Sequence, residues 1–163
     1  MIGFLTRSSV LWSLFGLQIL IWIGFVLIMS TYDFVLIDEM WDLEAIRAYI
    51  GELSHEQKRA HIWTTASLEV LFPLAYGAFY IGLTMRVFER FGRWLILPAV
   101  AAIPIDLTEG VVQVLALNGQ ADVIWHKVWV TPWKLGLFMA ASVIALAALA
   151  ILLKRKFLPT ANA

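Results

Sequence analysis

Three carboxylates and one lysine lie inside long apolar stretches of this chain, where charged side chains are rare. Asp106 and Glu109 are three residues apart and Gln113 follows four residues later, so all three share one face of a helix. Acids within a membrane span are energetically costly and normally point toward partners inside a bundle. Carboxylates placed in this way can act as a general acid and a general base.

A second polar face is predicted in the apolar stretch 63–87. Its members follow one another at steps of four, four, three and four residues: Thr65, Glu69, Pro73, Tyr76 and Tyr80. These steps put them on one side of a helix that is otherwise largely apolar. Pro73 removes a backbone hydrogen bond and frees a carbonyl near Glu69, although kinks of this kind are also common in membrane helices.

Lys134 is the base that we expect to meet these acids. It lies one turn inside a helix that begins near Thr131, with Pro132 suited to the first turn, and we expect Trp133 to line the same site. Glu69, Asp106 and Glu109 cannot all be ionised and paired with one lysine in a low dielectric. We therefore predict that at least one acid is protonated at neutral pH, or that the site takes up a cation.

The composition indicates the environment of these residues. Of 163 residues, 61% are hydrophobic and only 15% are charged, whereas globular proteins carry about 25% charged residues. Twelve basic residues balance twelve acidic ones, so the net charge gives no indication of a nucleic-acid partner. The absence of cysteine excludes disulfides, thiolate metal sites and thiol nucleophiles. The sequence predicts an integral membrane protein.

About 20 apolar residues cross a bilayer, and four stretches of sufficient length are present. We predict a single all-α membrane domain over 1–163, an up-down-up-down four-helix bundle with spans at about 8–32, 63–87, 94–117 and 131–153. The first span is too long for the apolar core of a signal peptide, and no small-x-small cleavage site follows it. We expect it to be retained.

The segment 33–62 is the longest polar part of the chain and is acidic at its start. Leu43, Ile46, Tyr49 and Ile50 recur at helical spacing, which predicts a short amphipathic helix. Ser54 with Gln57 three residues later is typical of a helix start with a capping box. We expect one or two short helices here that lie over one membrane face and act as a lid.

Basic residues predict the orientation. Arg7, the turn 86–93 and the tail 154–156 fall on one side of the predicted bundle. The positive-inside rule then places both termini in the cytoplasm, the protein in the inner (cell) membrane, and the loop 33–62 outside. At about 1.5 Å per residue, the five polar residues would lie in the outer half of the bilayer, in a pocket that opens outward: Glu69, Asp106, Glu109, Gln113 and Lys134.

Histidines could indicate a metal or haem site, but their positions disfavour it. His55 and His61 are six residues apart, which is not the spacing of a metal-binding helix pair. His61 and His126 lie outside the apolar spans, where a membrane haem would normally be held. We expect no metal and no cofactor, and we assign His61 as a proton donor at the mouth of the pocket.

Three functions fit these residues. The first is binding, or acid–base transformation, of a small lipophilic substrate by isomerisation, hydration or dehydration. In that case Glu109 or Glu69 would be the acid or base, Asp106 and Lys134 would tune it, and His61, Thr65, Tyr76, Gln113 and Trp133 would position the ligand. The second is an accessory subunit of a larger membrane complex, or a homo-oligomer, whose buried charges are a structural clasp. The third is binding or transport of a cationic amphiphile. Whether the protein is an enzyme is left open.

Overall fold

The structure, a computed structural model, describes residues 2–157. Met1 and residues 158–163 of the predicted domain lie outside the described part. The elements are α1 (Ile2–Leu5), α2 (Ser8–Tyr32), η1 (Ile37–Glu39), α3 (Leu43–Glu52), α4 (His55–Leu95), α5 (Leu97–Leu117), η2 (Ala121–His126) and α6 (Lys127–Phe157). The described residues are all-helical and contain no strand. Four helices are long and apolar enough to cross a membrane, as the sequence predicts.

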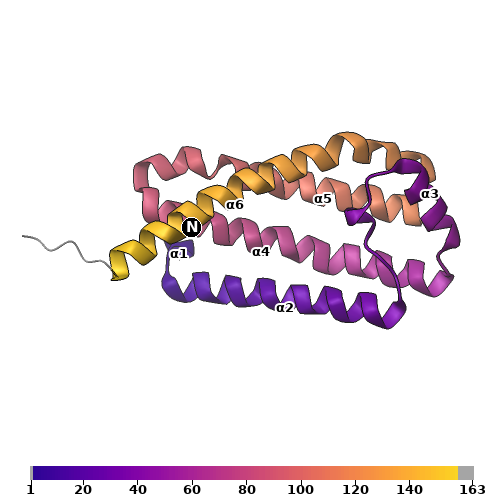
Figure 1. The fold of residues 1–163 in the computed structure, drawn as a ribbon, viewed down its shortest axis with the longest axis horizontal. Helices are drawn as coiled ribbons and strands as arrows, with labels where there is room; N and C mark the ends of the chain where they lie inside the picture. The colour runs from indigo at the N-terminus through magenta and orange to yellow at the C-terminus, as the bar shows by residue number, and fades with distance from the viewer. Residues whose placement is uncertain (1, 158–163) are drawn as a thin grey trace, which may run out of the picture.

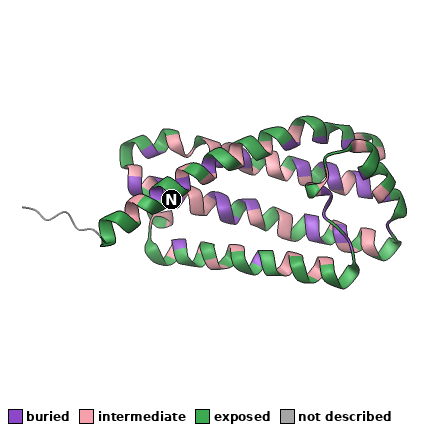
Figure 2. Cartoon of the chain, in the orientation of Figure 1, coloured by how far each residue is buried: buried purple, intermediate pink, exposed green. Residues whose placement is uncertain are grey.

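The four long helices lie side by side along the long axis of the molecule (Figure 1). α4 is the central element, because it packs extensively against α2, α5 and α6. α5 and α6 also pack against each other, whereas α2 has its main helix contact with α4 alone. The two buried side chains of α2 are Leu11 and Ile21, and the rest of the helix is partly or fully exposed (Figure 2). Two hollows lined by side chains of α2, α4 and α6 lie between α2 and α6, and we call this space the groove between α2 and α6.

α4 begins where the sequence predicts a helix start. The Ser54 hydroxyl accepts from the Gln57 amide, and the Gln57 side chain accepts from the Ser54 amide, which is a complete capping box. The predicted span 63–87 is the middle of a 41-residue helix. Glu89, at φ 43° and ψ −110°, interrupts the helical geometry within the predicted basic turn 86–93. The chain reverses there and enters α5.

α6 begins earlier than the sequence predicts. We expected residues 121–130 to form a surface segment and the helix to start near Thr131. Instead η2 ends at His126 and the helix runs from Lys127, so Pro132 lies within it. This difference brings Lys127, Thr131 and Lys134 onto one helical face at steps of four and three residues. Lys127 is 3% exposed.

The segment between α2 and α4 folds back onto the bundle. α2 ends at Tyr32, and its C-cap residue Asp33 has a left-handed φ of 50° and an amide that donates to Met29 O. The apolar residues of the segment between α2 and α4 form one core cluster with residues of α5 and η2: Phe34, Leu36, Ile37, Ile46, Ile50, Leu53, Val112, Ala116, Leu117 and Ile124. Ile37 and Ile46 are fully buried. Burial of these side chains holds η1 against the bundle.

Candidate functional site

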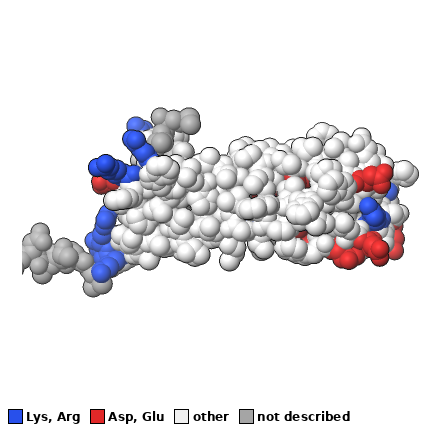
Figure 3. Space-filling model, turned by 90° about the horizontal axis from the view of Figure 1, so that it is seen from above, with Lys and Arg blue, Asp and Glu red and all other residues white. Residues whose placement is uncertain are grey.

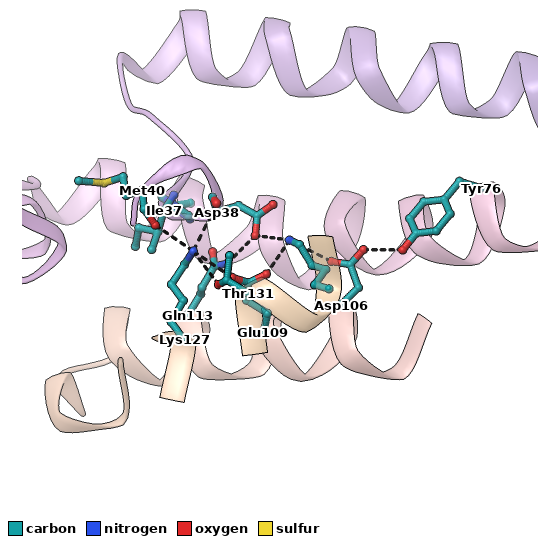
Figure 4. Close-up of polar contacts among 11 residues, drawn as sticks. Ile37, Asp38, Met40, Tyr76, Asp106, Glu109, Gln113, Lys127 and Thr131 are labelled. Atoms are coloured by element: carbon teal, nitrogen blue, oxygen red, sulfur yellow. Dashed lines mark hydrogen bonds and ion pairs between the residues drawn. The ribbon is translucent and has the colours of Figure 1, made fainter. Parts of the chain in front are cut away.

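Two lysines of α6 and carboxylates from three other elements meet at the end of the bundle that carries η1. Asp38 comes from η1, Glu69 from α4, and Asp106 and Glu109 from α5. Figure 4 shows Asp38, Lys127, Thr131 and Glu109 side by side, with Asp106 and Tyr76 farther along the bundle. Residues more than 70 positions apart in the chain are therefore in direct contact.

Glu109 is at the centre of this cluster and is fully buried. Its Oε1 accepts a hydrogen bond from the Thr131 hydroxyl and lies 2.9 Å from Lys127 Nζ. Its Oε2 lies 2.6 Å from Lys134 Nζ. The α6 face formed by the early helix start thus surrounds this carboxylate with two ammonium groups and one hydroxyl. Pairing and hydrogen bonding of this kind are what a buried charge requires.

Lys127 also ties η1 to the bundle. Its ammonium donates to the backbone carbonyls of Asp38 at 3.3 Å and Met40 at 3.0 Å. Asp38 is the middle residue of η1, and Met40 follows the end of η1 directly. Lys127 therefore joins α5, α6 and the loop through one buried charge (Figure 4).

Lys134 is the second ammonium, and it contacts three carboxylates. Its Nζ lies 2.5 Å from Asp38 Oδ1, 2.6 Å from Glu109 Oε2 and 3.3 Å from Asp106 Oδ1. These partners come from the loop and from α5. The Lys134 side chain is 15% exposed, so the ion pairs are largely shielded from water.

Two polar side chains extend the network. The Tyr76 hydroxyl donates to Asp106 Oδ2 at 2.9 Å, which links α4 to α5 (Figure 4). The Gln113 amide donates to Asp38 Oδ1 at 3.2 Å and so supports the position of η1. Gln113 is fully buried, and its own carbonyl oxygen has no hydrogen-bond partner among the described residues.

Glu69 differs from the other acids because it makes no ion pair within the described residues. Its Oε1 is buried and has no hydrogen-bond partner there either. A buried carboxylate oxygen without a partner costs free energy, on the order of 1–3 kcal/mol. Such a group in a native structure calls for a specific explanation, such as a bound ligand or a proton.

A cavity of about 280 Å³ adjoins Glu69. Its polar lining consists of Asp38, Glu69, Tyr76, Asp106 and Lys134. The rest of the lining is apolar or aromatic: Phe25, Leu36, Phe72, Pro73, Leu135 and Phe138. Because α2, α4 and α6 all contribute walls, the cavity lies along the groove between α2 and α6. Mostly apolar walls with a few convergent polar groups are typical of small-molecule sites.

The charges around the cavity do not balance. Four carboxylates (Asp38, Glu69, Asp106 and Glu109) face two ammonium groups (Lys127 and Lys134). Ionisation of all six groups would leave the cluster with two excess negative charges. Excess charge of one sign in a buried site is relieved by binding protons or a cation.

The predicted site residues fall into three groups. Glu69, Asp106, Lys134 and Tyr76 line the cavity. Glu109, Gln113, His61 and Thr65 are buried beside it without lining it. Trp133 is 67% exposed and is not part of the cavity wall. Glu109, which we considered as a catalytic acid, is thus enclosed by its partners, and Glu69 is the glutamate that faces the cavity.

Three residues of the cluster were not among the predicted site residues: Asp38, Lys127 and Thr131. Asp38 belongs to the acidic start of the segment 33–62, which we expected to lie over one membrane face. Lys127 belongs to a segment that we placed outside the fourth span. The spacing of Lys127, Thr131 and Lys134 at four and three residues was a signal for one helical face. No local signal distinguishes Asp38 from Asp33, Glu39 or Asp42.

His61 anchors the loop. It is fully buried, and its Nε2 accepts a hydrogen bond from the Ile37 amide at 3.1 Å. The neutral ring therefore carries its proton on Nδ1, which lies 3.3 Å from the Thr65 hydroxyl. The Phe34 ring packs against it with a centroid separation of 4.9 Å.

We expect His61→Phe to loosen the segment 33–42. The substitution keeps a ring against Phe34 but leaves the buried Ile37 amide unpaired, at a cost of about 1–3 kcal/mol. The expected result is faster hydrogen exchange at Ile37 and faster tryptic cleavage at Arg47. The control is His55→Phe, since His55 is exposed at the start of α4. Equal exchange in both variants would show that His61 does not hold the loop.

Among the described residues, no group of three or more histidine, aspartate or glutamate side chains is arranged to hold a metal ion. No family model, curated protein or solved structure matches the chain. The function must therefore be inferred from the geometry of this site.

Proposed function

We propose that the protein is an integral membrane protein whose cavity binds a small lipophilic molecule, and that Glu69 contacts the polar group of that molecule. The observation that carries the proposal is the unpartnered, buried Oε1 of Glu69 beside a cavity with aromatic and aliphatic walls. A ligand hydroxyl or protonated amine would supply the missing hydrogen bond. Apolar walls would hold its hydrocarbon part.

The arrangement in the membrane follows from the charges at the two ends. Basic side chains gather at the end opposite η1, and acidic side chains at the end of the loop, with an uncharged surface between them (Figure 3). We propose that α2, α4, α5 and α6 cross the inner membrane up-down-up-down, with both termini in the cytoplasm. Residues 33–54 then lie on the outer face, and η1 covers the cavity from that side.

The cavity also supports proton transfer. Glu69 makes no ion pair with any residue that the structure describes, whereas Asp106 is held by Tyr76 and Lys134. Carboxylates in unlike surroundings differ in proton affinity, which suits one of them to accept a proton and another to remain charged. If the bound molecule reacts, we propose Glu69 as the general acid or base of an isomerisation, hydration or dehydration. Lys134 and Tyr76 then fix Asp106 and orient the ligand.

Native mass spectrometry of the protein extracted in mild detergent tests the proposal. We expect a defined small lipophile to accompany the wild-type protein and to be lost in Glu69→Gln. The control is Glu52→Gln, which removes an exposed glutamate at the end of α3. Retention of the same molecule by Glu69→Gln would refute the role of Glu69.

A second candidate function is an accessory subunit of a larger membrane complex. The observation that favours it is the enclosure of Glu109 by Lys127, Thr131 and Lys134, because this buried carboxylate is paired entirely with groups of the protein. In that case the cluster is a clasp that holds η1, α5 and α6 together. A stoichiometric protein partner and no small molecule in the same spectra would support this function over the first.

A further inference from the structure

A second hollow lies in the groove between α2 and α6, at the end opposite the carboxylate cluster. Its volume is about 540 Å³, which is within the usual range for ligand sites. Apolar side chains from three helices form most of its walls: Leu11, Trp12 and Phe15 of α2, Phe79 and Leu83 of α4, and Leu149 and Leu152 of α6. We name this hollow the basic-end groove.

Three cations stand at the mouth of the basic-end groove. Arg86 of α4 and the neighbouring Arg155 and Lys156 of α6 are all part of its lining, and all three are exposed. None of them pairs with a carboxylate among the described residues. Arg86 donates one hydrogen bond to Ser8 Oγ at 2.7 Å, and its other N–H groups make no hydrogen bond to the described residues. The mouth therefore presents positive charge and unused donors.

The surroundings add to this positive charge. Arg7 precedes α2, Arg90 and Arg93 lie near the end of α4, and Lys154 lies near the end of α6, so all four are at this end, where Glu89 is the one acid of the described residues. Figure 3 shows basic side chains gathered at this end. α2 begins at Ser8, also part of the lining, so the positive end of its helix dipole lies at the mouth. An anion at this point would meet a clear excess of positive charge, with Glu89 as the one acid of the described residues at this end.

The shape of the groove combines this cationic mouth with an apolar interior. Trp12 is 73% exposed and Leu149 is 40% exposed, although both are strongly apolar. α2 and α6 do not pack extensively on each other, and Phe79 and Leu83 of α4 form the floor of the groove between them, with Leu83 itself buried. A molecule with a negative headgroup and a hydrocarbon chain matches both parts. Basic pockets between membrane helices on the cytoplasmic side bind anionic headgroups in this way.

We propose that the basic-end groove is a binding site for an anionic phospholipid of the membrane. Arg86, Arg155 and Lys156 hold its phosphate, and an acyl chain lies over Phe79 and Leu83 between α2 and α6. The lipid thereby fills the space that separates α2 from α6. The proposal depends on membrane residence, which is part of the proposed function, but not on the cavity beside Glu69.

The test compares lipid retention between two variants of equal charge change. In Arg86→Gln/Arg155→Gln/Lys156→Gln the cations of the groove are removed. The second variant, Arg90→Gln/Arg93→Gln/Lys154→Gln, removes three cations that lie at the same end of the molecule but do not line the groove. Each protein is reconstituted in vesicles of equal phosphatidylglycerol and phosphatidylcholine, extracted in mild detergent and examined by native mass spectrometry. We expect the wild-type protein and the second variant to retain phosphatidylglycerol, with at least tenfold less retained by the first.

A variant without charge change tests the groove itself. Leu149→Trp places a larger side chain at an exposed position of the wall and should lower phosphatidylglycerol retention while leaving the cations in place. Equal loss in both charge variants, or equal retention of the two lipids by the wild-type protein, would overturn the proposal. A protein seated on the groove in place of lipid would also overturn it.

These outcomes are independent of the function of the cavity. Extraction of the protein from membranes by alkaline carbonate would refute membrane residence and the lipid site together. Failure of Glu69→Gln to release a small molecule would refute the role of the cavity and leave the lipid result standing.

Discussion

Replacement of Lys134 by methionine is expected to cause a large loss of stability. Methionine keeps much of the apolar stem but removes the ammonium from Asp38, Asp106 and Glu109 at once. Removal of one partner from a buried ion pair costs on the order of 3–5 kcal/mol, because the remaining charge is left without compensation. The measurement is the midpoint of thermal unfolding in one fixed detergent.

Two further variants identify the cause of this loss. Lys154→Met removes an exposed lysine near the end of the same helix and should leave the midpoint nearly unchanged. Addition of Asp38→Asn and Asp106→Asn to Lys134→Met removes two of the stranded charges and should recover part of the stability. A midpoint in Lys134→Met equal to that of the wild-type protein would show that the cluster is not the structural centre of this end.

Glu69→Leu is expected to have the opposite effect and to stabilise the ligand-free protein. Glu69 Oε1 is buried without a hydrogen-bond partner among the described residues, and leucine of similar size would relieve a cost of about 1–3 kcal/mol. The protein must be freed of bound lipophile before the measurement, since a ligand stabilises the form that binds it. A gain in stability on substitution is what we expect of a residue that is kept for function at the expense of stability.

Glu109→Leu provides the contrast. Its carboxylate has Lys127, Lys134 and Thr131 as partners, so the substitution should leave the buried Lys127 without a carboxylate, remove one of the three carboxylates from Lys134, and lower the unfolding midpoint. A higher unfolding midpoint in Glu69→Leu and a lower one in Glu109→Leu would distinguish a ligand-facing acid from a structural one. Destabilisation by both substitutions would place Glu69 in the clasp and favour the subunit function.

The division between these glutamates also shows why buried charge alone does not identify a functional residue. Glu109 is the more deeply buried of the two, yet each of its carboxylate oxygens lies at ion-pair distance from a lysine ammonium. Glu69 has less protein around it and adjoins a cavity. The lack of a partner, together with the adjacent cavity, is what makes it the stronger candidate.

Local pattern in the sequence was sufficient to locate the helices. Apolar length places α2 at 8–32, the bounds that the structure has, and the Ser54–Gln57 pair marks the start of α4. The run 86–93 contains the reversal between α4 and α5. These features depend on residues within a few positions of one another, so composition, spacing and capping are enough to predict them.

The contacts of the site were decided by tertiary structure. Helical spacing showed which residues share a helix face with Asp106, Glu109 and Lys134. It did not show how each helix is rotated, and therefore which neighbour each face meets. The path of the loop was open as well, and it brings Asp38 to Lys134 across 96 positions of the chain. That path follows from the burial of Phe34, Leu36 and Ile37 against α5 and η2, and from the bond between Ile37 and His61. These interactions join segments that are distant in the chain. The sequence by itself therefore determined which residues could act as acids, bases or ion-pair partners. Only the packing of the helices and the loop decided that Glu69 faces the cavity and that Glu109 is enclosed.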